Sequence, residues 1–196
     1  CLDILSTNRS VYGYLSIGGT FEVDYYLNSC STNTKAKIGA NSGEKLEKGQ
    51  IIHLKNIKKI LPKNKIEYLN SKIENIRIIK GPHFDYFSKD AIDSFFSNEF
   101  NVTKLSDRMG IRLKGPKISN IKNTNIKSEG LVKGVIQITS DGDPIIMLSD
   151  HGTIGGYPKI GVVISADYDK LVQIPPGSKI KFKEINLKDA ETIFKL

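Results

Sequence analysis

The chain has 196 residues, of which 39% are hydrophobic and 26% are charged. These values are typical of a globular protein with one sizeable core or two small ones. No run approaches the roughly 20 apolar residues that a helix needs to cross a bilayer. The first residues also lack the basic start and apolar stretch of a signal peptide. We therefore expect a cytoplasmic protein without a membrane segment.

Charge and cysteine content further limit the classes of protein to which the chain could belong. Two cysteines, Cys1 and Cys30, are too few for a disulfide framework or a metal-ligand set, so we expect no metal site. The net charge of +8 and the pI of about 9.3 raise the question of nucleic-acid binding. The lysines are scattered among Asn and Ile, however, and no platform of aromatic and arginine residues could stack bases. We expect no nucleic-acid partner.

The first part of the chain alternates short extended runs with polar turns. This pattern predicts strands at Tyr12–Ile17 and Ile51–Leu54, and either a strand or a short extended piece at Thr20–Leu27. The segment Lys55–Asn75 is rich in Lys and Asn, and it is typical of a linker or a variable insertion. We therefore predict a partial first β domain with this linker at residues 1–75, and a second domain at residues 76–196.

A strand and a helix open the second domain. The run Ile76–Ile79 predicts the strand, and Ser88 is a plausible N-cap for the helix. Ile92, Phe95 and Phe96 share one face of that helix and are expected in the core. His83 lies alone in the intervening turn, where a structural role is commoner than a ligand role.

Arg108 is the first candidate for chemistry. Its planar, permanently charged guanidinium suits a carboxylate or a phosphate. The neighbouring Asp107 either orients this group for a ligand or only neutralises it, and both alternatives stay open. The next residues, Ile111–Leu113, alternate as a strand.

Residues 134–167 are the most informative stretch. Val135–Thr139 and Ile145–Ser149 predict two strands, and Asp141-Gly142 between them favours a tight hairpin turn. A third strand is predicted at Ile160–Ser165.

The loop before that third strand collects chemically capable groups. It holds a carboxylate, an imidazole, a hydroxyl, a phenol, an amine and three glycines: Asp150, His151, Gly152, Thr153, Gly155, Gly156, Tyr157 and Lys159. Glycine permits positive φ and exposes backbone N–H groups, so such a loop can hold an anion. The alternative is that the glycines only form a tight turn.

The C-terminal part predicts short elements. Tyr168–Val172 suits a helix with Asp167 as its N-cap, Lys179–Ile185 alternates as a half-buried strand, and a closing helix follows. Many short strands with two or three brief helices favour a mainly antiparallel β architecture, most simply a barrel.

Several motifs, in this order, resemble the carboxyltransferase-type family that includes the C subunit of bacterial 5-oxoprolinase (KipA), the second subunit of allophanate hydrolase and the carboxyltransferase part of urea carboxylase. They are Ser106–Leu113, Gly115-Pro116, Ser128–Gly130, Gly134–Gln137, Asp141–Ile145, Thr153–Ile160 and Ile164–Asp167. The resemblance implies cyclophilin-like antiparallel β-barrel domains. One barrel would begin near Ile76, and the earlier part would complete a second barrel. Because family members carry a further N-terminal segment and this chain begins with Cys, we expect a fragment.

The resemblance also implies a function. We expect a subunit of an ATP-dependent 5-oxoprolinase that opens 5-oxo-L-proline to L-glutamate. Its partners would be a KipI-like protein and an amidohydrolase-like LamB/YcsF-like protein, with ATP used by the assembled complex. One alternative is the carboxyltransferase part of a urea carboxylase or allophanate hydrolase system, which accepts a carboxyl group from biotin carried by a partner. The other is a non-catalytic regulator that binds a KipI-like kinase inhibitor.

The residues themselves indicate roles within such a site. His151 is the candidate general acid or base, and Arg108, with Asp107, and Lys159 could stabilise negative charge. Gln137 could orient an amide substrate. The remaining substrate-binding candidates come from the loop: Thr153, Gly155, Gly156 and Tyr157.

Overall fold

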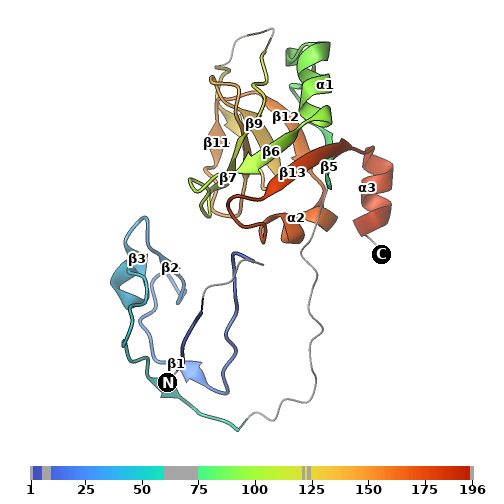
Figure 1. Cartoon of the computed structure of the whole chain (residues 1–196). Coiled ribbons are helices and arrows are strands. Elements are labelled where there is room, and N and C mark those ends of the chain that lie inside the picture. Colours follow the sequence, from blue (N-terminus) through green and yellow to red (C-terminus); the bar gives the residue numbers. More distant parts are fainter. Residues whose placement is uncertain (1, 6–9, 60–74, 121, 123–124, 195–196) are drawn as a thin grey trace. The chain divides into compact units, whose positions relative to one another are not determined.

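The computed structural model describes residues 2–5, 10–59, 75–120, 122 and 125–194 (Figure 1). The chain divides into two compact units, one formed by Cys1–Gly13 with Leu69–Leu196 and the other by Tyr14–Tyr68. Most of the predicted linker, residues 60–74, lies outside the described residues. The boundary near residue 75 therefore stays a prediction.

A closed barrel of seven strands forms the larger unit (Figure 1). Around the barrel the order is β10-β7-β6-β13-β5-β12-β9, and each neighbouring pair is antiparallel except β13 with β5, which is parallel. The predicted mainly antiparallel barrel is thus confirmed, with one parallel pair added. The strands are β5 (Asn75–Lys80), β6 (Glu99–Val102), β7 (Gly110–Lys114), β9 (Val135–Ile138), β10 (Pro144–Met147), β12 (Lys159–Val163) and β13 (Lys179–Glu184).

Alternating apolar residues of these strands fill the barrel, and aromatic rings pack against one another in part of its core. Phe95, Phe100 and Phe182 are each almost fully buried. The Phe95 and Phe182 rings stack with their centroids 4.5 Å apart. Phe95 comes from helix α1 (Lys89–Ser97), whose predicted N-cap is confirmed because Ser88 Oγ accepts from the Ala91 N–H at 3.2 Å.

Two further helices follow the barrel strands, α2 (Ser165–Leu171) and α3 (Leu187–Phe194). The prediction that Asp167 caps α2 is wrong, because Ile164 is the N-cap and Asp167 lies in the first turn. The Asp167 carboxylate is fully buried and accepts from Arg77, at 2.8 Å from its backbone N–H and 2.9 Å from Nε. This ion pair fastens α2 to β5, and it satisfies a buried charge that would otherwise be very costly.

The described residues of the smaller unit form two short ribbons and a 3-10 turn. In one ribbon β1 (Thr20–Phe21) pairs with β4 (Leu54–Lys55), and in the other β2 (Thr32–Asn33) pairs with β3 (Ile38–Gly39). The turn is η1 (Asn41–Gly43).

The strands that the sequence predicts in this part of the chain are absent or shorter in the structure. Tyr12–Ile17 forms no strand, Thr20–Leu27 is reduced to β1, and Ile51–Leu54 contributes only its last residue to β4. An extended run becomes a strand only where a partner completes its backbone hydrogen bonds, and the sequence pattern does not report that partner. Among the described helices of the whole chain, none is long and apolar enough to span a membrane.

Candidate functional site

The predicted hairpin between β9 and β10 is confirmed. Gly142 has φ +77°, as the turn requires, and its N–H donates to the Thr139 carbonyl at 2.9 Å. Asp143, at the end of this turn, binds the ammonium groups of Lys114 and Lys117. Burial raises the pKa of the Asp143 carboxyl, but the two ammonium groups outweigh this effect and hold it below its usual value.

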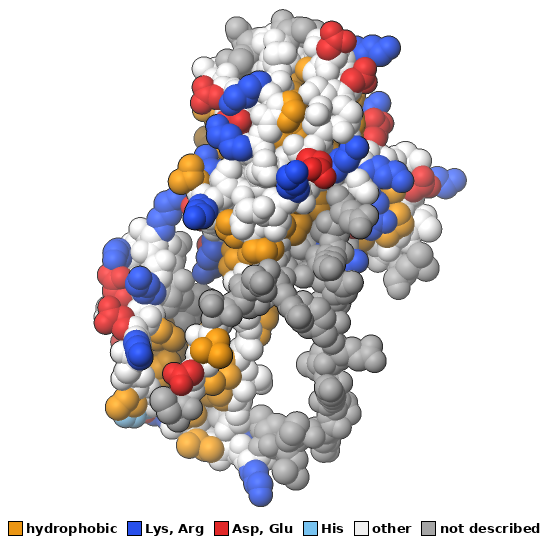
Figure 2. All heavy atoms as spheres, in the orientation of Figure 1, with side chains coloured by type: hydrophobic (Ala, Val, Ile, Leu, Met, Phe, Trp, Pro, Cys, Tyr) orange, Lys and Arg blue, Asp and Glu red, His pale blue; other side chains and the backbone are white. Residues whose placement is uncertain are grey.

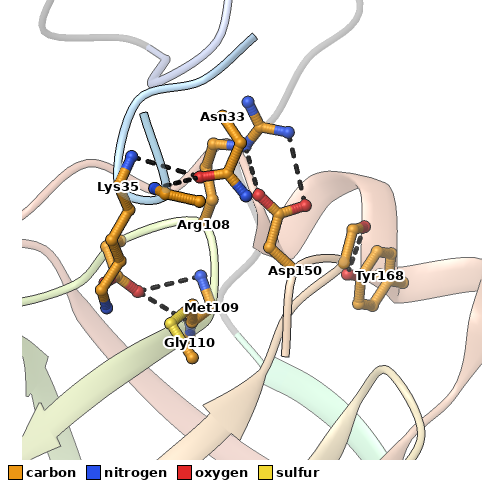
Figure 3. Close-up of polar contacts among 10 residues, drawn as sticks. Asn33, Lys35, Arg108, Met109, Gly110, Asp150 and Tyr168 are labelled. Carbon is orange, nitrogen blue, oxygen red and sulfur yellow. Dashed lines mark hydrogen bonds and ion pairs between the residues drawn. The ribbon is translucent and has the colours of Figure 1, made fainter. Parts of the chain in front are cut away.

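Arg108 and Asp150 form the first group of candidate site residues, which we call the rim pair (Figure 3). Arg108 Nε lies 2.8 Å from Asp150 Oδ2, and Nη2 lies 3.3 Å from Oδ1. The backbone supports this arrangement because the Asp150 N–H donates to the Arg108 carbonyl at 3.1 Å, in continuation of the β7–β10 pairing. The loop of residues 150–158 therefore starts directly beside Arg108.

Asp107 organises the turn that presents Arg108. Its Oδ1 accepts from the backbone N–H groups of Met109, at 2.9 Å, and Gly110, at 3.2 Å. This is the local capping pattern that favours Asp in turns. The carboxylate that meets the Arg108 fork through both oxygens is instead Asp150, which the sequence reasoning did not pair with it.

His151 follows the rim pair and is half-buried. Its Nδ1 lies 2.6 Å from the Gly152 carbonyl oxygen, which can only accept, so Nδ1 carries the proton. A neutral ring in this tautomer presents a proton acceptor at Nε2. The geometry thus agrees with the predicted role as a base without testing it.

Tyr12 joins this part of the barrel unit although no sequence signal pointed to it. The side-chain amide of Gln173 brackets its backbone, accepting from the Tyr12 N–H at 2.8 Å and donating to the Tyr12 carbonyl at 3.1 Å. Burial raises the pKa of the Tyr12 phenol; Arg108 opposes this effect and Asp150 adds to it. The phenol therefore lies within the electrostatic influence of the rim pair.

A second group lies on the outer face of β9 and β12, and we call His83, Glu129, Gln137 and Lys159 the buried cluster. The Lys159 side chain is only 4% exposed, and its Nζ donates to Glu129 Oε2 at 2.9 Å. Glu129 comes from the two-residue strand β8 (Glu129–Gly130) and keeps 48% of its side chain exposed. Its hydrogen bond with Lys159 lowers the pKa of the Glu129 carboxyl.

His83 completes the surroundings of this ion pair. The backbone N–H of His83 donates to the Lys159 carbonyl at 3.2 Å. The ring Nδ1 of His83 accepts from the backbone N–H of Lys159, also at 3.2 Å. Because Nδ1 accepts, the ring proton is on Nε2. This Nε2–H faces Glu129 Oε1 at 3.6 Å.

Gln137 is the register partner of Lys159 on the neighbouring strand. Its neighbours Ile136 and Ile138 lie in the barrel core, so strand alternation places Gln137 on the outer face with Lys159. The Gln137 Nε2 donates to the Tyr157 carbonyl at 3.0 Å, and only 4% of the residue is exposed.

The glycines of the loop act differently from the prediction. Gly152, Gly155 and Gly156 have no positive φ. A Cβ at Gly155 would instead lie 2.8 Å from Gln137 Nε2, and one at Gly156 would lie 3.1 Å from the Ile126 carbonyl oxygen. The loop needs glycine here because its strand β11 (Ile154–Gly155), paired with β8, passes very close to the barrel wall.

The predicted site residues therefore fall into two sets of contacts. Arg108 and His151 lie at the rim pair with Asp107 at its turn, whereas Lys159, Gln137, Gly155 and Tyr157 belong to the buried cluster or contact it. Thr153 is exposed, and its carbonyl accepts from the Leu131 N–H at 2.9 Å. Glu129 is a site residue that the sequence pattern did not indicate, although the Ser128–Gly130 motif contains it. Within the described ranges, no group of three or more His, Cys, Asp or Glu side chains could hold a metal ion.

Comparison with known proteins places this geometry in a family. Residues 1–184 match the family described as "Carboxyltransferase domain, subdomain A and B". The chain belongs to this family.

Named relatives of this carboxyltransferase-domain chain include 5-oxoprolinase subunits and urea amidolyases. The C subunit of 5-oxoprolinase is 32% identical over 193 residues in Escherichia coli and 33% identical over 189 residues in Haemophilus influenzae. Each alignment covers 96% of this chain and 61% of the relative, so the chain spans about three fifths of their length. "Urea amidolyase" of Saccharomyces cerevisiae is 29% identical over 213 residues, covering 98% of this chain and 12% of that protein.

Solved structures support the same assignment. The urea carboxylase of Kluyveromyces lactis is similar with a TM-score of 0.72 and 26% identity, over 92% of this chain and 18% of that one. The urea amidolyase of the same organism is similar with a TM-score of 0.72 and 27% identity, over 92% of this chain and 12% of that one. The carboxyltransferase-type fold that the motifs predicted is therefore confirmed.

Proposed function

We propose that this carboxyltransferase-domain chain acts as a subunit of an ATP-dependent 5-oxoprolinase, which opens 5-oxo-L-proline to L-glutamate. Its partners would be a KipI-like protein and a LamB/YcsF-like protein. The names of the two bacterial relatives support this choice, at 32% and 33% identity against 29% for the yeast urea amidolyase.

One geometric observation carries the proposal, namely the placement of Lys159 beside Gln137 on paired strands. The substrate 5-oxoproline carries one carboxylate and one lactam amide. A buried ammonium recognises a carboxylate, and a buried primary amide can donate to a carbonyl or accept from an N–H. Since the two side chains lie on the same outer face of the barrel, together they match the two polar groups of the substrate.

Ring opening adds water across the lactam bond. The C–N bond breaks, the carbonyl carbon gains the hydroxyl, and the nitrogen gains a proton. Within this chain, Gln137 would orient the amide and Lys159 would hold the carboxylate. His151 presents its Nε2 lone pair in the separate set of contacts at the rim pair, so we assign it no step on a ligand held by Lys159 and Gln137.

We do not assign ATP to the glycine loop of this chain. Gly155 and Gly156 pack closely against Gln137 and the Ile126 carbonyl oxygen. We therefore assign ATP to another part of the assembled enzyme and derive no step through it here.

The second candidate is the carboxyltransferase component of a biotin-dependent urea carboxylase. The similarity to the K. lactis urea carboxylase favours it. Urea is also an amide, so Gln137 would keep its role. Lys159 would then meet the carboxylate of carboxybiotin presented by a partner.

Co-expression separates the two candidates. The protein would be produced with the KipI-like and LamB/YcsF-like proteins, and the loss of 5-oxoproline would be followed with and without ATP. ATP-dependent formation of glutamate is the expected result. If the complex leaves 5-oxoproline unchanged, whereas a biotin carboxylase partner supports carboxylation of urea, the second candidate replaces the first.

A further inference from the structure

Two buried donors and one exposed acceptor meet in the buried cluster. The side chains of Lys159 and His83 are 4% and 9% exposed, whereas 48% of the Glu129 side chain is exposed. Both carboxylate oxygens face donors, Oε2 at 2.9 Å from Lys159 Nζ and Oε1 at 3.6 Å from His83 Nε2. The donors are covered positions on the outer face of the barrel, and the carboxylate reaches them from the exposed strand β8.

The donors are fixed in place by the barrel. Lys159 opens β12, and its backbone N–H and C=O are both bonded to His83, at Nδ1 and at the backbone N–H. These bonds orient the His83 ring and leave its Nε2–H directed at the carboxylate. A buried ammonium without a counterion is very costly, so some carboxylate must occupy this position in the free protein.

Glu129 is held much more weakly than its donors. Both residues of β8 are exposed, and their strand partner is β11, where Ile154 is 62% exposed. The contact of Oε1 with His83 is longer than a hydrogen bond. Asp167 shows the contrast, because that permanent counterion is fully buried and accepts from both the backbone and the side chain of Arg77.

We propose that Lys159 and His83 form a binding site for the carboxylate of a small molecule, which Glu129 occupies as an internal counterion until the ligand displaces it. A ligand carboxylate replaces one ion pair with an equivalent one, so the Lys159 ammonium is never left unpaired. Gln137 lies beside this site on the paired strand, where its Nε2 donates to the Tyr157 carbonyl. The choice of 5-oxoproline as that ligand rests on the proposed function, but the carboxylate site does not.

The test compares binding of two ligands to the assembled complex by calorimetry. One is 5-oxoproline and the other is 5-oxoprolinamide, which lacks the carboxylate. Glu129→Gln removes the competing charge and keeps the size of the side chain. If the displaced state is about one tenth populated in the free wild-type protein, the variant binds 5-oxoproline roughly tenfold more tightly. Binding of the amide is expected to stay unchanged.

Two further variants sharpen the experiment. Lys159→Met should abolish the preference for the acid over the amide. Glu99→Gln is the matched control, because Glu99 pairs with Lys179 in an exposed ion pair with side chains 58% and 63% exposed. This control should bind both ligands as the wild type does, and thermal unfolding checks that every variant is folded.

The outcomes separate this inference from the proposed function. Equal or weaker binding of 5-oxoproline by folded Glu129→Gln overturns the inference, even if the wild-type complex turns over 5-oxoproline. Suppose instead that the complex shows no turnover, but the variant binds acetate or bicarbonate more tightly than the wild type. The carboxylate site then stands, and the proposed substrate fails.

Discussion

Asp150 meets the guanidinium of Arg108 through both carboxylate oxygens, at 2.8 Å to Nε and 3.3 Å to Nη2. Most of the Arg108 side chain, 62%, remains exposed, so the pair lies at the surface and can meet a ligand or a partner protein. An exposed ion pair of this kind contributes less than about 1 kcal/mol to folding. The main effect of the ion pair is therefore to orient the Arg108 side chain.

Arg108→Lys tests that orientation. Lysine keeps the charge but loses the planar two-point contact with Asp150. We expect the free energy of unfolding to stay near that of the wild type, and kcat/KM of the assembled enzyme to fall about tenfold or more. Arg112→Lys, at an exposed position of the following strand, is the control. Full activity of Arg108→Lys would show that the rim pair has no role in turnover.

Asp167→Ala, in contrast to Arg108→Lys, should lower the free energy of unfolding, because it removes the buried partner of Arg77. Breaking a buried ion pair on one side costs about 3 to 5 kcal/mol. Urea denaturation should therefore show a large loss in the free energy of unfolding for Asp167→Ala and almost no loss for Glu99→Gln. A loss below about 1 kcal/mol for Asp167→Ala would mean that α2 does not depend on the contact with β5.

Gly155→Ala tests the close approach of the loop to the barrel wall. Its Cβ would lie 2.8 Å from Gln137 Nε2 and 2.9 Å from Leu131 Cδ1, so Gln137 must move. Such overpacking costs about 1 to 3 kcal/mol of stability, and KM should rise with it. Gly130→Ala on the paired strand is the control, because its Cβ would meet no atom within 4 Å. Equal KM values for the two variants would contradict the assigned role of Gln137.

The lowered pKa of Asp143 predicts a pH dependence of stability. A carboxyl group with a depressed folded-state pKa stabilises the protein above its unfolded-state pKa, here near the ordinary 3.8, and this contribution disappears as the pH falls through the lower folded-state value. The wild type should thus be more stable than Asp143→Asn at about pH 7, and the difference should shrink as the pH falls below 3.8. A difference that stays constant or grows on acidification would refute the assignment.

Local signals account for the parts of the fold that the sequence predicted well. The alternation in Ile76–Ile79, the cap at Ser88 and the turn at Asp141-Gly142 each depend on a few neighbouring residues. Asp167 was misread because its partner, Arg77, lies 90 residues away in sequence. A first-turn carboxylate resembles a cap unless that distant cation is known.

The candidate site was predicted in composition but not in arrangement. The residue types of the loop and the motifs indicated Arg108, Gln137 and Lys159. The structure adds Glu129, which is 30 residues from Lys159, and Tyr12, which is 161 residues from Gln173. Such pairs depend on how the barrel closes, and Figure 2 shows cationic and anionic side chains interspersed on the barrel face in view, so charge alone does not single them out.

In the proposed function, the buried ammonium of Lys159 recognises the carboxylate of the substrate. The most direct measurement is the ATP-dependent conversion of 5-oxoproline to glutamate by the assembled complex, with either wild-type chain or Lys159→Met. We predict that the folded variant loses this activity through a large rise in KM. Wild-type KM and kcat in Lys159→Met would show that Lys159 does not recognise the substrate carboxylate.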